Sequence, residues 1–233
     1  MQTRSSQTWA ERSSEMELKT HFEVKPGMGR PSDSRIAQWY TFEVFVSEFD
    51  LKNLNKVDRN GHTALDGAVA NHDPETRSRT ASWLLDHGAD PNAGTDPDST
   101  VLHILFDRKQ HDPVRDAELL RRLLEAGADI NKSVPKYGRP LAYLLEHFDP
   151  RYEGERYFFD VLFSRPDLDL VARSKRTGES FAVNVLRKGR ARDNWRGAPE
   201  SPLEGMIRER LLAQGHDPEV VLAQVVGSGG GAS

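Results

Sequence analysis

Residues 73–92, DPETRSRTASWLLDHGADPN, decide the fold because the chain repeats them. A related stretch, DPVRDAELLRRLLEAGADIN, begins at Asp112, and a fainter one, DPRYEGERYFFDVLFSRPDLD, begins at Asp149. The second stretch starts 39 residues after the first, and the third starts 37 residues after the second. A period of this size indicates a solenoid, in which stacked units supply each other's core. The functional residues are therefore expected on the surface of the stack.

The repeated stretch has the features of a long helix at both of its ends. Asp73, Asp112 and Asp149 each precede a proline. Aspartate accepts hydrogen bonds from the first N–H groups of a helix, and proline fits the first helical position. Gly88 and Gly127 suit the left-handed residue that follows a helix. Each Asp-Pro therefore predicts the start of a long helix.

A second recurring piece precedes each long helix and predicts a shorter one. It reads GHTALDGAV from Gly61, DSTVLHILF from Asp98, GRPLAYLL from Gly138 and GESFAVNVL from Gly178. Thr63, Thr100 and Ser180 place a hydroxyl where it can cap the helix, and Pro140 occupies the first helical position. Each unit thus contains a short helix, a long helix and a turn into the next unit.

Together the two pieces resemble the G-x-T-P-L-H and G-A-D-x-N signatures of ankyrin repeats. The resemblance is carried by Gly61-His62-Thr63-Ala64-Leu65, Thr100-Val101-Leu102-His103, Gly88-Ala89-Asp90-Pro91-Asn92 and Gly127-Ala128-Asp129-Ile130-Asn131. It covers residues 58–217 and implies an all-α helix-turn-helix solenoid. About four to five partly degenerate repeats, with short hairpin turns and terminal capping helices, are expected. It also implies that the His103 ring hydrogen-bonds neighbouring turns.

The chain departs from the family pattern in three places. Its units exceed the roughly 33 residues of a typical repeat, and the extra length falls between the paired helices. Arg165-Pro166-Asp167 replaces the Gly-Ala-Asp signature, and a basic insert is expected over residues 187–202. Leu211-Leu212-Ala213-Gln214-Gly215 restores the end of a long helix.

Composition and local patterns divide the chain into three parts. Residues 1–34 form a polar N-terminal extension, 35–226 the solenoid with its caps, and 227–233 a flexible Gly/Ser tail. The apolar residues between Ser34 and Phe49 predict a single helix that covers the open face of the first repeat.

The composition suits a soluble protein, with 36% hydrophobic and 29% charged residues among 233. No apolar run approaches the about 20 residues of a membrane span, and the first residues lack the apolar centre of a secretory signal. We expect a cytoplasmic monomer that does not bind membranes. The absence of cysteine excludes disulfides and thiolate metal sites.

Catalytic motifs are missing from the sequence. It contains no H-E-x-x-H, no G-x-S-x-G and no glycine-rich loop that ends in Lys-Ser/Thr. His72 and His111 recur just before the Asp-Pro pairs, which favours a local structural role. We expect no enzymatic activity, no cofactor, no metal and no small-molecule substrate.

The remaining function is recognition of another protein by the concave surface that stacked repeats create. The candidate residues lie at hairpin tips and on short-helix faces: Arg59, Asn60, His62, Asn71, Asp96, Asp98, Asp107, Arg108, Lys136, Tyr137, Glu146, His147, Arg176, Arg187 and Lys188. Their charge changes sign along the groove, which favours a partner with its own acidic and basic patches. Tyr137 is the best candidate for an aromatic anchor.

Several functions fit such a surface. A single stack is suited to blocking or sequestering its partner, as ankyrin-type immunity proteins do with a cognate toxin, and a scaffold or adaptor fits nearly as well. Residues 173–196 contain eight basic and two acidic residues beside Trp195, which would suit an acidic partner or a nucleic-acid-binding accessory. The net charge of −4 disfavours nucleic acid.

Overall fold

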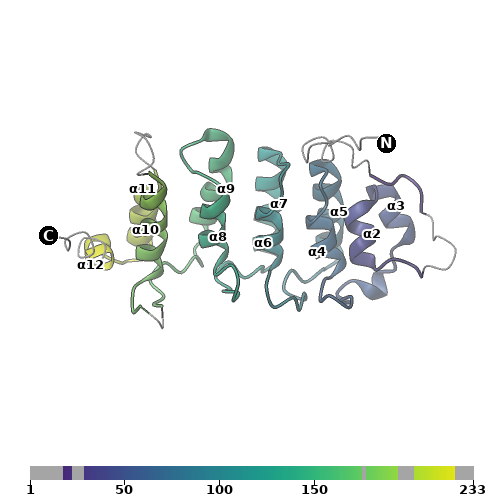
Figure 1. Cartoon of the computed structure of the whole chain (residues 1–233), viewed down its shortest axis with the longest axis horizontal. Coiled ribbons are helices and arrows are strands. Elements are labelled where there is room, and N and C mark those ends of the chain that lie inside the picture. Colours follow the sequence, from purple (N-terminus) through teal and green to yellow (C-terminus); the bar gives the residue numbers. More distant parts are fainter. Residues whose placement is uncertain (1–17, 23–28, 175–176, 194–201, 224–233) are drawn as a thin grey trace, which may run out of the picture.

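The described part of the chain is a row of paired helices (Figure 1). The computed structural model describes residues 18–22, 29–174, 177–193 and 202–223. Within these residues the helices are α2 (Asp33–Trp39), α3 (Phe42–Glu48), α4 (Ala64–Val69), α5 (Pro74–Asp86), α6 (Val101–Phe106), α7 (Pro113–Glu125), α8 (Pro140–His147), α9 (Glu153–Ser164), α10 (Phe181–Asp193), α11 (Leu203–Ala213) and α12 (Pro218–Leu222), with a 3₁₀ turn, η1 (Leu51–Asn53). The all-α solenoid predicted from the sequence is confirmed.

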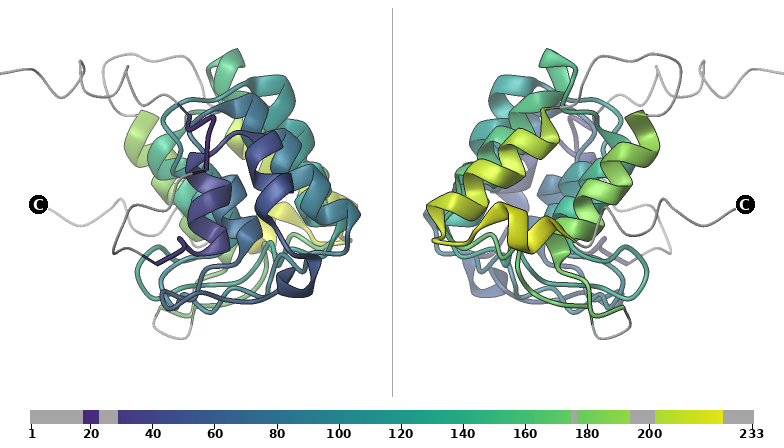
Figure 2. Two further views of the ribbon diagram at one scale, coloured as in Figure 1. Left: turned by 90° about the vertical axis from the view of Figure 1, so that its right-hand side faces the viewer. Right: turned by 90° about the vertical axis from the view of Figure 1, so that its left-hand side faces the viewer.

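The helices form two layers. Helices α2, α4, α6, α8 and α10 contact one another in order and make the inner layer, while α3, α5, α7, α9 and α11 make the outer layer. Figure 2 shows the two layers end on. The loops that enter α4, α6, α8 and α10, here called fingers, lie along the lower edge of Figure 1. Residues one repeat apart therefore lie side by side on neighbouring fingers.

Most of the predicted helix ends are confirmed. The Asp73 carboxylate accepts the N–H of Thr76 at 2.7 Å, and Asp112 caps α7 in the same way. Thr63 caps α4 and forms a reciprocal box with Asp66. Gly88 adopts a φ of 86°, in the left-handed region that glycine tolerates best. Local sequence thus sets where these helices begin and end.

Asparagine side chains tie consecutive fingers together. Asn92 accepts the N–H of Asp129 at 3.1 Å and donates to the carbonyl of Gly127 at 2.7 Å. Asn131 repeats this arrangement one unit later with Asp169 and Asp167. Hydrogen bonds repeated at this period fix the spacing of the fingers.

A buried ion pair joins two outer helices. Arg77 on α5 and Asp116 on α7 are both fully buried, and the guanidinium donates through Nε and Nη2 to the two carboxylate oxygens at 3.0 Å. Arg77 also donates to the carbonyls of Asn71 and Gln110. His111 completes the cluster, with Nδ1 2.9 Å from Asp116 and Nε2 2.8 Å from the carbonyl of Arg108. The structural role predicted for His111 is confirmed.

The single helix predicted between Ser34 and Phe49 is wrong. The chain breaks at Tyr40, whose φ of −114° and ψ of 161° are extended, and Thr41 then caps α3. The two helices add to the inner and outer layers as a degenerate repeat. Packing is close, because a Cβ on Gly67 of α4 would lie 2.0 Å from the Ser34 carbonyl oxygen of α2.

The helix predicted at Asp149-Pro150 begins later, at Glu153. The Asp149 carboxylate binds the guanidinium of Arg151 and accepts the Arg151 N–H. The carbonyl of Asp149 then accepts the N–H of Tyr152. This turn consumes the residues that would otherwise form the first turn of the helix.

The basic insert predicted over residues 187–202 is wrong for its first half. Residues 187–193 continue α10 without a break, since Arg187, Lys188 and Arg190 are good helix formers. Residues 194–201 lie outside the described part of the chain.

Candidate functional site

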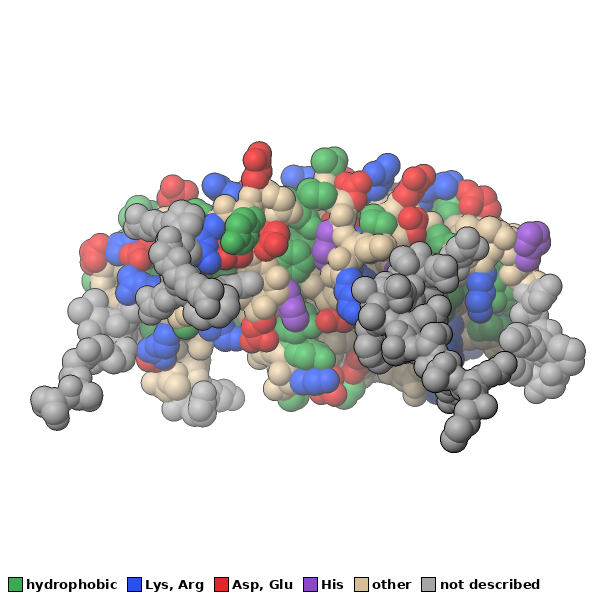
Figure 3. All heavy atoms as spheres, turned by 45° about the horizontal axis from the view of Figure 1, so that its top comes forward, with side chains coloured by type: hydrophobic (Ala, Val, Ile, Leu, Met, Phe, Trp, Pro, Cys, Tyr) green, Lys and Arg blue, Asp and Glu red, His purple; other side chains and the backbone are tan. Residues whose placement is uncertain are grey.

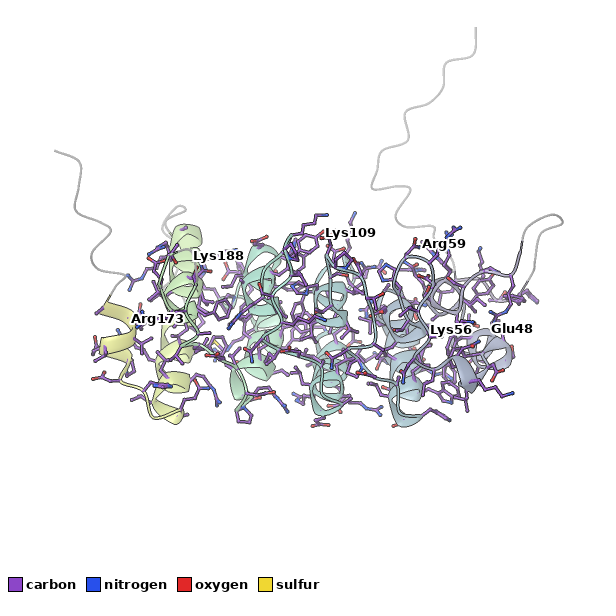
Figure 4. All side chains as sticks on the ribbon, turned by 90° about the horizontal axis from the view of Figure 1, so that it is seen from below. Glu48, Lys56, Arg59, Lys109, Arg173 and Lys188 are labelled. Atoms are coloured by element: carbon purple, nitrogen blue, oxygen red, sulfur yellow. The ribbon has the colours of Figure 1, made fainter. Side chains whose placement is uncertain are left out.

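The exposed and half-exposed residues of the fingers and inner helices form one continuous candidate surface, here called the finger surface. It includes Arg59, Asn60, His62, Asp96, Asp98, Asp107, Lys136, Tyr137, Glu146, His147, Arg187 and Lys188. Seen from the finger side, Arg59 and Lys188 lie along the same long side of the stack (Figure 4). The periodic fold therefore gathers residues that are spread over more than half of the sequence.

Four rings meet at the centre of the finger surface, and we call them the ring cluster. The ring centre of Tyr137 in the third finger lies 4.7 Å from that of Tyr143 in α8, and the ring centre of Tyr143 lies 4.5 Å from that of His147. His103 of α6 lies 5.3 Å from Tyr143. His147 is exposed and Tyr137 half-exposed, while the other two rings are buried. Buried rings beneath exposed ones make a rigid aromatic platform.

Asp107 extends the ring cluster onto the neighbouring repeat. The Tyr143 hydroxyl donates to the Asp107 carboxylate at 2.9 Å. Burial, together with this hydrogen bond, raises the pKa of Tyr143, so the phenol keeps its proton at physiological pH. On the other side, the Lys136 ammonium lies 4.8 Å from the centre of the Tyr137 ring, within cation–π range. A carboxylate and an ammonium therefore flank the aromatic platform.

His103 holds the inner edge of the ring cluster in place. The backbone N–H of Thr100 faces Nδ1 at 3.3 Å, so Nδ1 is the acceptor and the proton lies on Nε2. Burial lowers the pKa of His103 to about 4, although the backbone of Gly138 acts in the opposite direction. The ring hydrogen-bonds Thr100 at the start of its own helix, whereas Nε2 is buried without a hydrogen-bond partner among the described residues, so the hydrogen bond to a neighbouring turn that the resemblance implies is found only on the Thr100 side.

The His103 pKa predicts a loss of stability in acid. Because the unfolded histidine has a pKa of about 6.5, the unfolded chain binds a proton first as the pH falls. Stability from this group is complete above about pH 6.5 and is lost as the pH falls toward 4. Between pH 7 and pH 5 the loss should be about 2 kcal/mol. Urea unfolding at pH 7 and at pH 5 measures this loss. The free energy of unfolding should fall by about 2 kcal/mol less in His103→Gln than in the wild type between the two pH values. Equal losses in the two proteins would contradict the assignment.

The first two fingers carry fewer interactions between side chains. Arg59 and Asn60 are exposed, and the Arg59 guanidinium has no hydrogen bond or ion pair with a described residue. His62 Nε2 lies 4.0 Å from Asp96. Asp96 accepts the N–H of Asp98 and the Ser99 hydroxyl, which confirms it as a turn residue. Arg59 therefore remains available to a partner.

Other predicted site residues are held in place by contacts within the chain. Glu146 pairs with Lys188 at 2.5 Å, and Arg187 pairs with Glu179 at 2.5 Å. Arg108 donates to the carbonyls of Ile104 and Ala70, so its role is largely structural.

Two candidates do not belong to the described surface. The prediction that Asn71 is exposed is wrong, because its buried amide donates to the carbonyls of Ala37 and Tyr40. Arg176 lies outside the described residues.

The outer helices present a different surface. Their exposed charges pair with one another, as Arg79 does with Glu43, Arg156 with Asp160, and Arg122 with Asp86. Side chains of both signs are interspersed over the visible face of Figure 3. Surface pairs of this kind contribute little energy and leave few unpaired charges for a partner.

The described residues offer no site for metal chemistry and no membrane segment. They contain no group of three His, Cys, Asp or Glu side chains that could hold a metal ion. Among the described helices, none is long and apolar enough to cross a bilayer.

Sequence reasoning missed Tyr143 as part of the site. The sequence analysis includes Tyr143 only as part of the short helix, although two features of the sequence indicate its place in the site. Tyr143 and His147 are four residues apart, which places them on one helix face. Tyr143 also follows Asp107 by 36 residues, about one repeat, which places them in one row across the stack.

Comparisons with known proteins agree with this architecture. Residues 60–96 match the family model described as the ankyrin repeat, in line with the resemblance seen in the sequence. Its fold is similar to that in "The crystal structure of a functionally unknown protein from Leptotrichia buccalis C-1013-b", with a TM-score of 0.56 and 20% identity, over 79% of this chain and 94% of that chain. No curated protein matches the sequence. Ankyrin repeats are typically non-catalytic modules of protein–protein interaction.

Proposed function

We propose that the finger surface binds one partner protein and thereby blocks or sequesters it. The observation that carries the proposal is the ring cluster, where exposed His147 and half-exposed Tyr137 rest on a buried, hydrogen-bonded layer. Rigid tyrosines flanked by charge are typical anchors of protein interfaces. On the outer helices, Arg79 pairs with Glu43 and Arg156 pairs with Asp160 instead.

The charge arrangement favours a partner protein over nucleic acid. Arg187, Lys188 and Arg190 pair with Glu179, Glu146 and Glu204. These cations of the basic segment are therefore partly neutralised, whereas a nucleic-acid site needs a continuous track of positive charge. Inhibition of a cognate toxin, as in immunity proteins, is one form that blocking could take, and an adjacent toxin gene would support it.

The test compares two triple alanine variants. Lys136, Tyr137 and His147 belong to the finger surface, whereas Arg121, Tyr152 and His216 form a control of matched chemistry on exposed positions elsewhere. The partner is first recovered from the native source with the wild-type chain and identified by mass spectrometry. Calorimetry should then show at least tenfold weaker binding by the finger-surface variant, because truncating an interface anchor commonly costs about 2 kcal/mol or more.

The control variant should bind within about threefold of wild type, because exposed substitutions away from the interface change energies by less than about 0.5 kcal/mol. Circular dichroism must show that both variants remain folded. Equal affinity of the two variants would overturn the proposal and move the search away from the ring cluster.

A further inference from the structure

A cavity of about 960 Å³ opens between α2, the first finger and the segment at Lys19. Its lining residues include Lys19, Arg30, Arg35, Trp39, Tyr40 and Asp58–Asn60. Lys19 forms one wall, because its N–H donates to the carbonyl of Trp39 and its carbonyl accepts the N–H of Thr41. The cavity lies at the N-terminal end of the stack and contains no residue of the ring cluster.

Four cations of the described part of the chain line this cavity, and two of them are available to a ligand. Arg30 is held by Asp33 at 2.7 Å and by the carbonyl of Glu48, and the Lys19 ammonium lies 5.3 Å from the Tyr40 ring centre. Arg35 and Arg59 have no hydrogen bond or ion pair with a described residue. The two guanidinium groups come from α2 and from the first finger, so they can approach one ligand from different elements.

Asp58, the single acid among the described lining residues, does not neutralise these cations by direct contact. Burial raises the pKa of Asp58, but hydrogen bonds from the Ser34 hydroxyl and from the backbone of Asn60 and His62 outweigh it and lower the pKa. Both carboxylate oxygens are occupied by these donors and by the Ser32 hydroxyl. Asp58 therefore shapes the finger, while Arg35 and Arg59 face the cavity with their donors unused by described residues.

We infer that this cavity binds an acidic peptide segment of the partner protein, an inference that rests on the proposed function. Guanidinium groups recognise carboxylates through paired hydrogen bonds. Trp39 adds apolar surface for the methylene groups of glutamate and for the peptide backbone. Nucleic acid fits less well, because the chain carries a net charge of −4 and because one of the two aromatic rings in the lining, Tyr40, is buried and covered by Lys19.

The test uses a fluorescein-labelled decapeptide of alternating aspartate and glutamate, with fluorescence anisotropy as the readout. The charge-reversal variant Arg35→Glu/Arg59→Glu should bind at least tenfold more weakly than wild type, since two carboxylate contacts become repulsive. Lys109→Glu/Lys132→Glu makes the same change in net charge at exposed positions outside the cavity and should stay within about threefold of wild type. Circular dichroism checks that both variants fold.

Three results would overturn the inference. The first is no binding of the decapeptide by the wild-type chain at low salt, and the second is an equal loss in the two double variants. The third is that an oligodeoxythymidine binds more tightly than the decapeptide and loses as much affinity in the Arg35→Glu/Arg59→Glu variant. This result would assign the cavity to a phosphate backbone. Because Lys136, Tyr137 and His147 are untouched, failure here leaves the test of the finger surface intact, and the two proposals fail separately.

Discussion

Replacing Asp116 by alanine is expected to lower the free energy of unfolding by about 3–5 kcal/mol, the cost of leaving a buried charge without its partner. Both Arg77 and Asp116 are completely inaccessible to solvent, and their two parallel hydrogen bonds join α5 to α7. Among the described residues, removal of the carboxylate leaves the guanidinium with only the carbonyls of Asn71 and Gln110 as hydrogen-bond acceptors. Urea unfolding, followed by circular dichroism, measures the change.

Asp160→Ala is the matched control, because it removes an exposed aspartate that pairs with Arg156 four residues earlier on one helix. It should cost less than about 1 kcal/mol. The double variant Arg77→Met/Asp116→Leu should recover much of the loss, since apolar side chains can replace a buried ion pair. A cost below about 1 kcal/mol for Asp116→Ala would show that water or another anion compensates the arginine.

This pair marks the boundary of what the sequence could predict. Arg77 and Asp116 both stand four residues after an Asp-Pro aspartate, so they occupy equivalent positions in successive units. The period therefore predicts that they are neighbours in the stack. Their burial could not be predicted, because Arg and Asp are usually exposed and only the packing of α5 against α7 excludes water here.

Two predictions of helix boundaries are wrong because a nearby side chain forms a hydrogen bond that the periodic pattern does not indicate. Asp149 has the same Asp-Pro context as Asp73, but the nearby Arg151 takes its carboxylate and delays the helix. At the other end, apolar content between Ser34 and Phe49 indicated one helix. The break depends on Thr41, a weak cap whose oxygen lies 3.5 Å from the Val44 N–H. Such choices depend on energies of about 1 kcal/mol and are not visible in a periodic pattern.

The sequence predicts where the candidate site lies on the stack, but not the contacts that its side chains make with neighbouring repeats. Tyr137 and Lys136 were placed at an exposed turn, and both lie on the finger surface. The role of Tyr143 depends on a hydrogen bond to Asp107 in the preceding repeat. Trp39 lines the N-terminal cavity because α2 belongs to the inner layer. Contacts across repeats require the exact length of each unit, which here varies between 39 and 37 residues.

Leu123→Ala in the long helix of the second unit should lower the free energy of unfolding by about 2–5 kcal/mol, through lost burial and the cavity that remains. Leu123 is fully buried in α7, and α7 contacts both α5 and α9. In a solenoid each unit is stabilised by its neighbours, so a defect in a central helix weakens two interfaces at once. Thermal and urea unfolding should both shift, and the urea transition should broaden as the two halves lose their coupling.

Leu212→Ala supplies the control, because it makes the same chemical change on α11 at a side chain that is 62% exposed. Its cost should stay below about 0.5 kcal/mol. A shift of less than about 0.5 kcal/mol for Leu123→Ala as well would contradict the register of α7. The two leucines differ mainly in burial. A much larger free-energy cost for Leu123→Ala than for Leu212→Ala would therefore show that the stability of the stack depends on the apolar face of its long helices. The residues of the finger surface could then differ from one partner to another without loss of the fold.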